Sequence, residues 1–103
     1  MVGFENHGGR TYLGKNVKPL GKVLKGFGNN GEDGTEGAIY KNSFGTYFHG
    51  PILPKNPEFA DFLIKLALKK KYDMSPTINL SPLDNFIEIR ARNVIANRLN
   101  VEL

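Results

Sequence analysis

Residues 43–54 read Ser-Phe-Gly-Thr-Tyr-Phe-His-Gly-Pro-Ile-Leu-Pro, and the other predicted elements are arranged around them. Phe44–Phe48 is a run of aromatic and β-branched residues, which predicts a buried strand. His49 ends this strand, the Gly-Pro pair after it breaks the strand ladder, and Pro54 is expected to close a short loop. The stretch therefore predicts a strand whose last residue is presented by a tight turn.

His49 is the candidate catalytic residue of this stretch. A histidine at the end of a strand is held by a fixed backbone, while the turn after it leaves the imidazole open to a cleft. Histidine is also the side chain whose ordinary pKa lies nearest to neutral pH, which suits a general base. The alternative, taken from these residues alone, is a histidine that merely ends a strand and has no chemical role.

Composition limits the class of protein. A chain of 103 residues with 40% hydrophobic and 23% charged residues is typical of one small globular domain. The chain has no cysteine, which excludes disulfides, thiolate metal sites and a cysteine nucleophile supplied from these residues. It has neither an apolar run long enough to span a membrane nor a signal peptide, so we expect a cytoplasmic protein. The net charge of +4 comes from scattered Lys and Arg residues, which argues only weakly for nucleic acid.

The first half of the chain predicts a glycine-rich, mostly antiparallel β ribbon. Short apolar or alternating runs separated by turn residues indicate strands. The Asn42-Ser43 pair lies between two such runs and predicts a hairpin. The expected strands are Met1–Asn6, Thr11–Leu13, Leu20–Phe27, Ala38–Tyr40 and Phe44–Phe48.

The second half predicts two amphipathic helices, at about 57–71 and 82–99, joined by a linker at 72–80. Asn56 is the expected N-cap of the first helix, with Pro57 at its first position and three lysines at its end. Residues 81–84, Ser-Pro-Leu-Asp, repeat the start signal, with Asp84 in the capping-box position. Each helix has an apolar stripe that needs a surface to pack on. No run resembles the continuous apolar strands of a parallel sheet.

Two motifs are set aside because their context is wrong. Gly26–Gly31 matches G-x-G-x-x-G, but no helix follows it, so we expect no dinucleotide site. The acids that follow in the same loop lack the spacing of a calcium loop. His7 and His49 are too few for a metal site unless carboxylates join them. We therefore expect neither a cofactor nor a metal.

Three segments taken together resemble the class I glutamine amidotransferases, in their cobyric-acid-synthase-like branch. They are Gly3-Phe4-Glu5-Asn6-His7-Gly8-Gly9-Arg10-Thr11, Gly26-Phe27-Gly28-Asn29-Asn30 and Gly45-Thr46-Tyr47-Phe48-His49-Gly50. Within the branch, the chain is similar to the glutaminase subunits of bacterial lipid II isoglutaminyl synthases. The resemblance runs from about residue 2 to about residue 72 and is weaker through the last helix. It implies that residues 1–103 are the C-terminal segment of an α/β amidotransferase domain: an antiparallel β ribbon followed by two helices.

The resemblance also implies roles for residues. His49 matches the histidine base that works with a cysteine nucleophile, and Asn6, Gly8 and Gly9 are candidate contacts to the substrate glutamine. The family releases ammonia from glutamine for an ATP-dependent, Mur-ligase-like synthetase subunit, which here would amidate the D-glutamate of lipid II. In the family the cysteine lies upstream of the region that resembles this chain, so we expect a missing N-terminal part of the same domain and no activity from the chain alone. Ser43 and Thr46 have no motif that supports either as a nucleophile.

One position departs from much of the family. Many class I enzymes carry a glutamate two residues after the histidine, where this chain has Pro51. The cobyric-acid-like branch tends to lack that glutamate too, so Pro51 favours this branch and leaves open what orients the imidazole. Two other functions remain: an amidotransferase of cobalamin synthesis, and a non-enzymatic basic binding module that could take nucleic acid. Our expectation is no nucleic acid and no membrane span.

Overall fold

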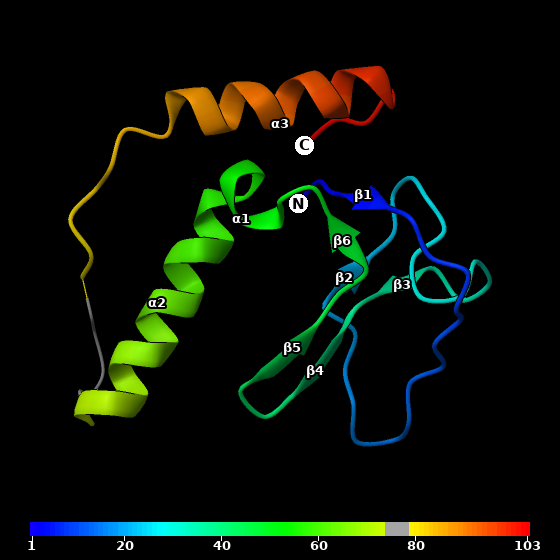
Figure 1. The fold of residues 1–103 in the computed structure, drawn as a ribbon, viewed down its shortest axis with the longest axis horizontal. Helices are drawn as coiled ribbons and strands as arrows, with labels where there is room; N and C mark the ends of the chain where they lie inside the picture. Colours follow the sequence, from blue (N-terminus) through cyan, green and yellow to red (C-terminus); the bar gives the residue numbers. More distant parts are fainter. Residues whose placement is uncertain (74–78) are drawn as a thin grey trace.

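A computed structural model describes residues 1–73 and 79–103, and in this part of the chain short strands precede the helices (Figure 1). The strands are β1 (Phe4–Glu5), β2 (Gly21–Lys22), β3 (Thr35–Glu36), β4 (Ala38–Tyr40), β5 (Ser43–Gly45) and β6 (Phe48–His49). The helices are α1 (Ile52–Lys55), α2 (Pro57–Tyr72) and α3 (Phe86–Arg98). The expected linker at 72–80 falls largely outside the described residues.

The strands form three separate antiparallel pairs rather than one ribbon. β1 pairs with β6, β2 with β3, and β4 with β5. The β1–β6 register sets Phe4 opposite His49 and thereby joins the N-terminal segment to the stretch at 43–54. A single bridge between Lys18 and Ile39 adds a link from the first loop to β4. Strands of two or three residues give little ladder bonding, so side chains must hold the pairs together.

The expected strand Phe44–Phe48 is wrong in extent and burial. It is divided between β5 and β6, and Phe44 and Phe48 are only half-buried while His49 is exposed. The interruption has a clear cause. The Glu36 carboxylate accepts hydrogen bonds from the Thr46 hydroxyl and the Tyr47 N–H, both at 2.8 Å. A side chain thus takes the place of a neighbouring strand at this point.

Two other expected strands were also wrong. Thr11–Leu13 is irregular, because the Thr11 N–H is bonded at 2.7 Å to the carbonyl of Asn29 in a loop rather than to a strand. The strand expected at Leu20–Phe27 shrinks to β2, and the following residues bend into the glycine-rich loop. The expected hairpin forms between β4 and β5, but its turn lies one residue earlier than expected, at Lys41 and Asn42, and Ser43 belongs to β5. Lys41 takes φ 54° in this turn.

Two adjacent asparagines organise the glycine-rich loop. Asn29 is buried, and its amide pairs with both the N–H and the carbonyl of Gly37, each at 2.9 Å. Asn30 donates to the Thr11 carbonyl at 3.0 Å and accepts from the N–H groups of Glu32 and Asp33. The loop is therefore fixed by buried amide groups instead of an apolar core.

Asn56 precedes α2 but does not cap it with its side chain. Its Oδ1 accepts from the Val2 N–H at 2.8 Å, and its Nδ2 donates to the carbonyls of Val2 and Ile52, both at 2.7 Å. The amide therefore pairs with Val2 as a neighbouring strand would. The sequence also missed α1, since Pro54 lies inside this helical turn rather than closing a loop. Pro57 begins α2 as expected, and the helix ends at Tyr72.

α3 begins four residues later than the sequence indicated. Residues 81–85 are not helical, and Asp84 accepts from the Phe86 N–H at 3.0 Å in front of the helix rather than within a capping box. The helix ends in a Schellman turn: Asn100 takes φ 55°, and the Val101 N–H bonds to the Ala96 carbonyl at 3.0 Å. This turn sends the last residues back beneath α3, where the C-terminus lies near the N-terminus (Figure 1).

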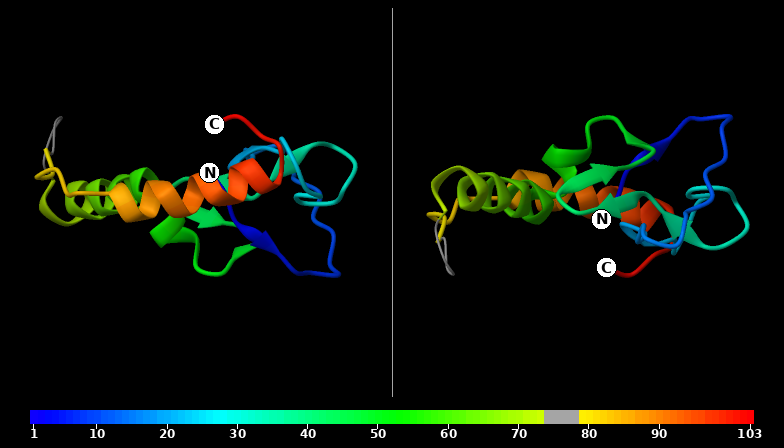
Figure 2. Two further views of the ribbon diagram at one scale, coloured as in Figure 1. Left: turned by 90° about the horizontal axis from the view of Figure 1, so that it is seen from above. Right: turned by 90° about the horizontal axis from the view of Figure 1, so that it is seen from below.

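The described residues bury few apolar side chains. The molecule is a slab of 39 × 36 × 20 Å, which the edge-on views show clearly (Figure 2). Val2 and Ala96 are the buried hydrophobic residues, whereas the buried polar ones are Asn29, Asn30, Glu36 and Asn56. Between the hairpin and α2, Phe44 packs edge-on against Phe59 and Phe62, with ring centroids 6.1 and 5.7 Å apart. The family fold expected from the sequence is therefore present only as small antiparallel sheets with helices, a partial α/β fold.

Candidate functional site

His49 is the last residue of β6 and lies on the surface. Its backbone pairs with Phe4, and Gly50 follows at φ 71°, a conformation that permits the sharp turn after the strand. The Lys55 ammonium of α1 donates to the Gly50 carbonyl and ties down this turn. The imidazole is exposed. A group placed this way is fixed through its backbone and open to an incoming reactant.

Pro51 does not supply a third catalytic group. It takes an extended conformation, with φ −63° and ψ 145°, directly before α1. The position two residues after the histidine therefore carries no carboxylate that could orient the ring. Within residues 1–73 and 79–103, no group of three or more His, Cys, Asp or Glu side chains could hold a metal ion. No described helix is long and apolar enough to cross a membrane.

The turn after β1 borders a hollow of about 620 Å³. The candidate glutamine contacts Asn6, Gly8 and Gly9 all line it, together with His7. Its opposite wall comes from the glycine-rich loop, including Asn30 and Gly31. The structure thus brings the three predicted contacts to one hollow.

His7 is held in one orientation. Its Nδ1 donates to the Gly9 carbonyl at 2.8 Å, because a carbonyl can only accept, and this sets the tautomer of a neutral ring. The ring stacks on Tyr47 with centroids 3.6 Å apart and planes 7° apart. The Tyr47 hydroxyl is in turn bonded to Thr11 at 2.6 Å. His7 therefore braces the turn that carries Gly8 and Gly9.

The Gly-x-Gly-x-x-Gly loop binds a carboxylate of this same chain. Glu5 Oε2 accepts from the Phe27 N–H at 3.0 Å and Oε1 accepts from the Gly28 N–H at 2.9 Å. Gly26 and Gly28 both have positive φ, so two successive N–H groups point at one anion. Sequence reasoning set the motif aside but did not find Glu5. Nothing in the sequence around Glu5 indicates that its carboxylate binds the backbone of Phe27, which lies 22 residues away.

His49 and the three candidate contacts lie close in topology but not in one cavity. β1 carries Phe4 opposite His49, and the chain continues from β1 directly into the Asn6–Gly9 turn. His49 is not among the residues that line the 620 Å³ hollow. The β1–β6 pair is thus the element that fixes the distance between the candidate base and the candidate glutamine contacts.

Comparison with known proteins assigns the family. A sequence profile of the CobB/CobQ-like glutamine amidotransferase domain matches residues 1–57, more than half of the chain. The chain belongs to this family. The matched region contains both the Asn6–Gly9 turn and His49. The resemblance to class I glutamine amidotransferases is thereby confirmed.

The relatives agree with the expected branch. The chain is 50% identical over 97% of its length to the lipid II isoglutaminyl synthase (glutamine-hydrolyzing) subunit GatD of Staphylococcus aureus. It is 60% identical over 68% of its length to the GatD subunit of Streptococcus pneumoniae, and 54% identical over 69% to a probable cobyric acid synthase of Methanothermobacter thermautotrophicus. The chain spans 39%, 27% and 14% of the lengths of these three relatives.

Proposed function

We propose that this chain is part of a glutaminase that hydrolyses the side-chain amide of glutamine. The observation that carries the proposal is the family match over residues 1–57, because it includes the exposed strand-end histidine and the turn with its hollow. His49 is the base that removes the proton from a cysteine thiol and delivers it to the leaving ammonia. The thiolate forms a bond to the amide carbon, the C–N bond breaks, and water then releases glutamate from the thioester.

The nucleophile must come from another segment. The chain contains no cysteine, and the Thr46 hydroxyl is already donated to Glu36. We propose that an N-terminal part of the same domain supplies it. The chain matches the C-terminal part of the S. aureus relative and covers 39% of the length of that protein, which supports this arrangement. On its own the chain is expected to release no ammonia.

Asn6, Gly8 and Gly9 are proposed to contact the glutamine. An amide side chain and N–H groups free of a Cβ suit the α-carboxylate and α-ammonium of an amino acid. Asn6 and Gly8 are exposed at the hollow, so they are available to a ligand. The brace between His7 and Gly9 keeps this turn in place before the ligand arrives.

The ammonia is proposed to pass to an ATP-dependent, Mur-ligase-like synthetase that amidates the D-glutamate of lipid II in the cytoplasm. The two GatD relatives support this acceptor, since the S. aureus protein is similar over 97% of the chain. Cobyric acid synthesis is the second candidate, favoured by the 54% identity to the M. thermautotrophicus protein over a shorter span.

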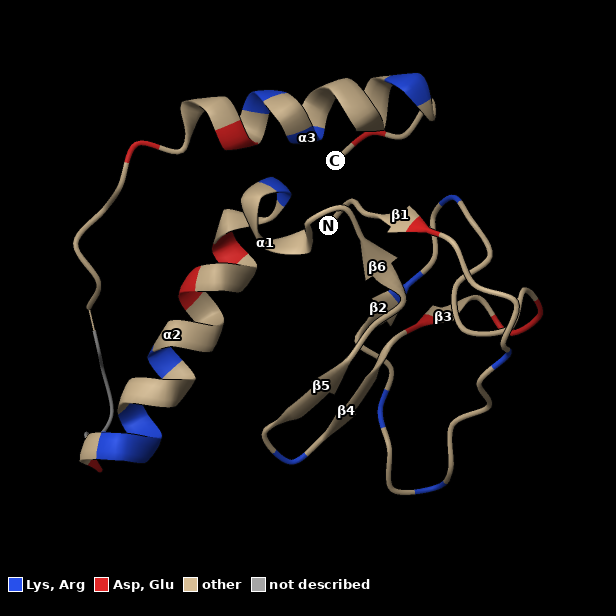
Figure 3. Cartoon of the chain, viewed as in Figure 1, with Lys and Arg blue, Asp and Glu red and all other residues tan. Residues whose placement is uncertain are grey.

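A basic binding module is the least supported function. Lysines and arginines are spread over loops and helices with acids between them, and the lysines of 69–71 gather only at the end of α2 (Figure 3). Arg10 and Arg92 are paired with Glu32 and Glu58. Such a distribution gives no continuous track for a nucleic-acid backbone.

The test compares two histidine variants in the glutaminase assembled with its cysteine-bearing part. His49→Ala should lower glutamine-dependent amidation by at least about a hundredfold, because the base is lost, while amidation from ammonium salts continues. His7→Ala is the matched control: it should be milder, since this ring braces the turn and transfers no proton. If His7→Ala abolished glutamine use while His49→Ala kept it, the assignment of the base would be wrong.

A further inference from the structure

Glu5 connects three parts of the candidate site. Its backbone pairs with Phe48 in β6, the strand that ends with the candidate base, and Asn6 follows it at the start of the turn. Its carboxylate accepts from the N–H groups of Phe27 and Gly28, which line the opposite wall of the 620 Å³ hollow. Glu5 therefore links the strand of the base, the candidate glutamine contacts and the wall that faces them.

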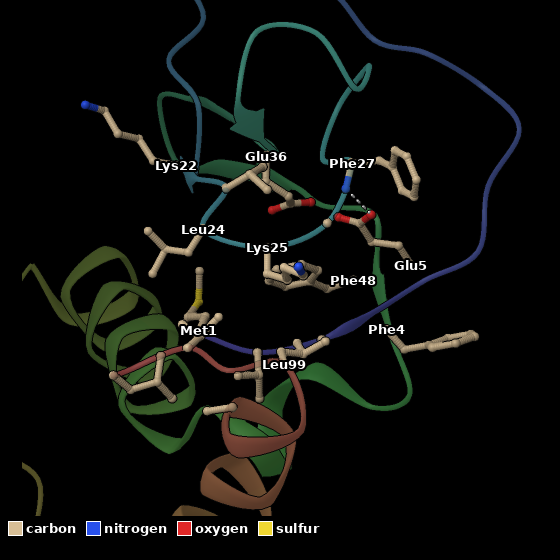
Figure 4. A pocket seen from close by; sticks show the side chains of 17 residues that line it. Met1, Phe4, Glu5, Lys22, Leu24, Lys25, Phe27, Glu36, Phe48 and Leu99 are labelled. Carbon is tan, nitrogen blue, oxygen red and sulfur yellow. Dashed lines mark hydrogen bonds between the residues drawn. The ribbon is translucent and has the colours of Figure 1, made fainter.

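The hydrogen bond between Glu5 and Phe27 lies where two hollows meet. Both residues line the 620 Å³ hollow and also a second hollow, of about 630 Å³, that reaches the end of α3. Figure 4 shows the carboxylate turned toward the Phe27 N–H within this second hollow. Phe27 is 76% exposed, so the packing of its ring holds this segment only weakly. The carboxylate is thus a main contact between the turn and this end of the loop.

The glycine-rich loop has the backbone shape that a carboxylate at this place requires. Gly26 takes φ 122° and Gly28 takes φ 65°, so successive N–H groups point at one anion. A Cβ at Gly26 would lie 3.3 Å from Glu5 Oε1, and a Cβ at Gly28 would lie 2.2 Å from the Thr35 carbonyl oxygen. Side chains at these two positions would disturb the contact, and the Gly-x-Gly pattern serves a carboxylate of the chain itself.

The other end of the turn is fixed to the same loop. The Thr11 N–H donates to the Asn29 carbonyl at 2.7 Å, and Asn30 Nδ2 donates to the Thr11 carbonyl at 3.0 Å. Residues 6–10 are thus held to the glycine-rich loop at both ends, by Glu5 before them and by Thr11 after them. Loss of the first hold would let the turn move relative to the wall that faces it, while the backbone pairing of β1 with β6 would remain.

We propose that Glu5 is a positioning residue for glutamine: its carboxylate sets the separation between the Asn6–Gly9 turn and the glycine-rich loop. The inference rests on the proposed function, because it assumes that glutamine binds at this turn. A carboxylate suits the task because each of its oxygens can accept one N–H. Glu5→Gln replaces one of these acceptors with an amino group, which cannot accept from the N–H that it faces. In this role Glu5 transfers no proton.

The test measures amidation from glutamine and from ammonium salts by the glutaminase assembled with its cysteine-bearing part and its synthetase. Glu5→Gln should raise the KM for glutamine at least about tenfold and change kcat by less than about threefold, because the turn is displaced while the base and the nucleophile stay in place. Amidation from ammonium salts should not change. The exposed Glu102→Gln is the matched control and should leave both constants at their wild-type values. A merely destabilising change would lower the active fraction, and therefore kcat, without raising KM.

Amide hydrogen exchange in the same assembly measures the hydrogen bonds themselves. Glu5→Gln should speed exchange at the N–H of Phe27 or Gly28 at least about tenfold, whereas Glu102→Gln should leave both rates unchanged. Unchanged exchange in Glu5→Gln would overturn the proposal, and so would a wild-type KM for glutamine even with faster exchange. A fall in kcat with the loss of one limb of the pH profile would also overturn it, since Glu5 would then be an acid or a base in the reaction.

Failure of the positioning role and failure of the proposed function give different results. A wild-type assembly that used ammonium salts but no glutamine would refute the proposed function and the positioning role with it. A wild-type assembly that used glutamine, with a KM that Glu5→Gln left unchanged, would refute the positioning role alone.

Discussion

At the scale of single residues, the chain is held together by buried polar side chains that bridge distant segments. Asn56 is 1% exposed and makes three side-chain hydrogen bonds, two of them to Val2. Asn29 bonds to the backbone of Gly37 across the glycine-rich loop. Glu36 bonds to the Tyr47 N–H between β5 and β6, where the expected strand is interrupted. Removal of such a group leaves buried backbone groups without partners, which costs more than a surface bond.

Asn56→Asp separates the two roles that an asparagine before a helix can have. Aspartate is as good an N-cap as asparagine, so a capping role predicts no loss. It lacks the N–H donors that reach the carbonyls of Val2 and Ile52, so the observed contacts predict destabilisation by about 2–4 kcal/mol. Urea unfolding measures the difference, with the exposed Asn93→Asp as the control. A variant as stable as the wild type would show that these bonds contribute little.

At the scale of elements, the β4–β5 hairpin is strained at its turn. Lys41 adopts φ 54°, where a Cβ is unfavourable, and glycine would be free of this cost. Glycine loses more conformational entropy than lysine on folding, which offsets part of this gain. Lys41→Gly should therefore stabilise the protein by a net amount of about 0.5 kcal/mol. The matched opposite change is Gly37→Ala, whose Cβ would lie 2.6 Å from the Gly45 carbonyl oxygen at φ 69°. Thermal melting should shift upward for the first variant and downward for the second.

The link between α2 and α3 is expected to depend on pH. Glu58 accepts from Arg92 at 2.8 Å. Its own backbone N–H at the start of α2, and then Arg92, hold the pKa of Glu58 below the ordinary value, although desolvation opposes them. A lowered folded-state pKa gives stability that is present above the ordinary glutamate range and is lost as the pH falls through the folded-state pKa.

Glu58→Gln should therefore destabilise the protein by less than about 1 kcal/mol at neutral pH, because the Glu58 side chain is largely exposed even though Arg92 is partly covered. The difference from the wild type should vanish at an acid pH that lies below the folded-state pKa of Glu58. Urea unfolding at both pH values tests this, with Glu102→Gln as a control that should show no difference. A gap that persists in acid would mean that Glu58 acts through packing.

At the scale of the whole molecule, the chain exposes the stripes that its helices were expected to bury. Leu83, Phe86 and Ile87 are all at least 66% exposed, and Phe62 on α2 is 45% exposed. Apolar faces of this extent are characteristic of surfaces that pack against other protein.

The chain by itself is consequently expected to self-associate or to be loosely packed. Sedimentation velocity should show species larger than the monomer, or near-UV circular dichroism should be weak while the far-UV signal remains. Co-expression with the N-terminal part should suppress both effects. A monomer that melts sharply would show that these exposed stripes need no partner.

Local signals in the sequence determined the elements whose causes are local. Pro57 and the terminal lysines marked α2, the Asn42 turn marked the hairpin, and the glycine after His49 marked the end of a strand. The same kind of signal failed at Thr11–Leu13, where the backbone bonds of a short segment go to a distant loop. His49 was singled out by its place at the end of a strand. Its role beside a cysteine, and the candidate contacts Asn6, Gly8 and Gly9, came from the family resemblance, because a lone histidine or glycine specifies no chemistry.

Only the tertiary structure decided which distant groups meet. It paired Phe4 with His49, attached Val2 to Asn56, and placed the Glu5 carboxylate in the glycine-rich loop. It also left Glu36 Oε2 buried without a hydrogen-bond partner among the described residues. The hydrogen bonds of Glu36 and Asn56 join residues that are 10 and 54 positions apart in the sequence. Periodicity and capping rules describe neighbours within a few residues, whereas a buried amide or carboxylate is satisfied by whichever backbone the fold brings within about 3 Å. For that reason the sequence determined that a β-rich half precedes two long helices, and the fold determined the contacts that position the candidate base and the Asn6–Gly9 turn.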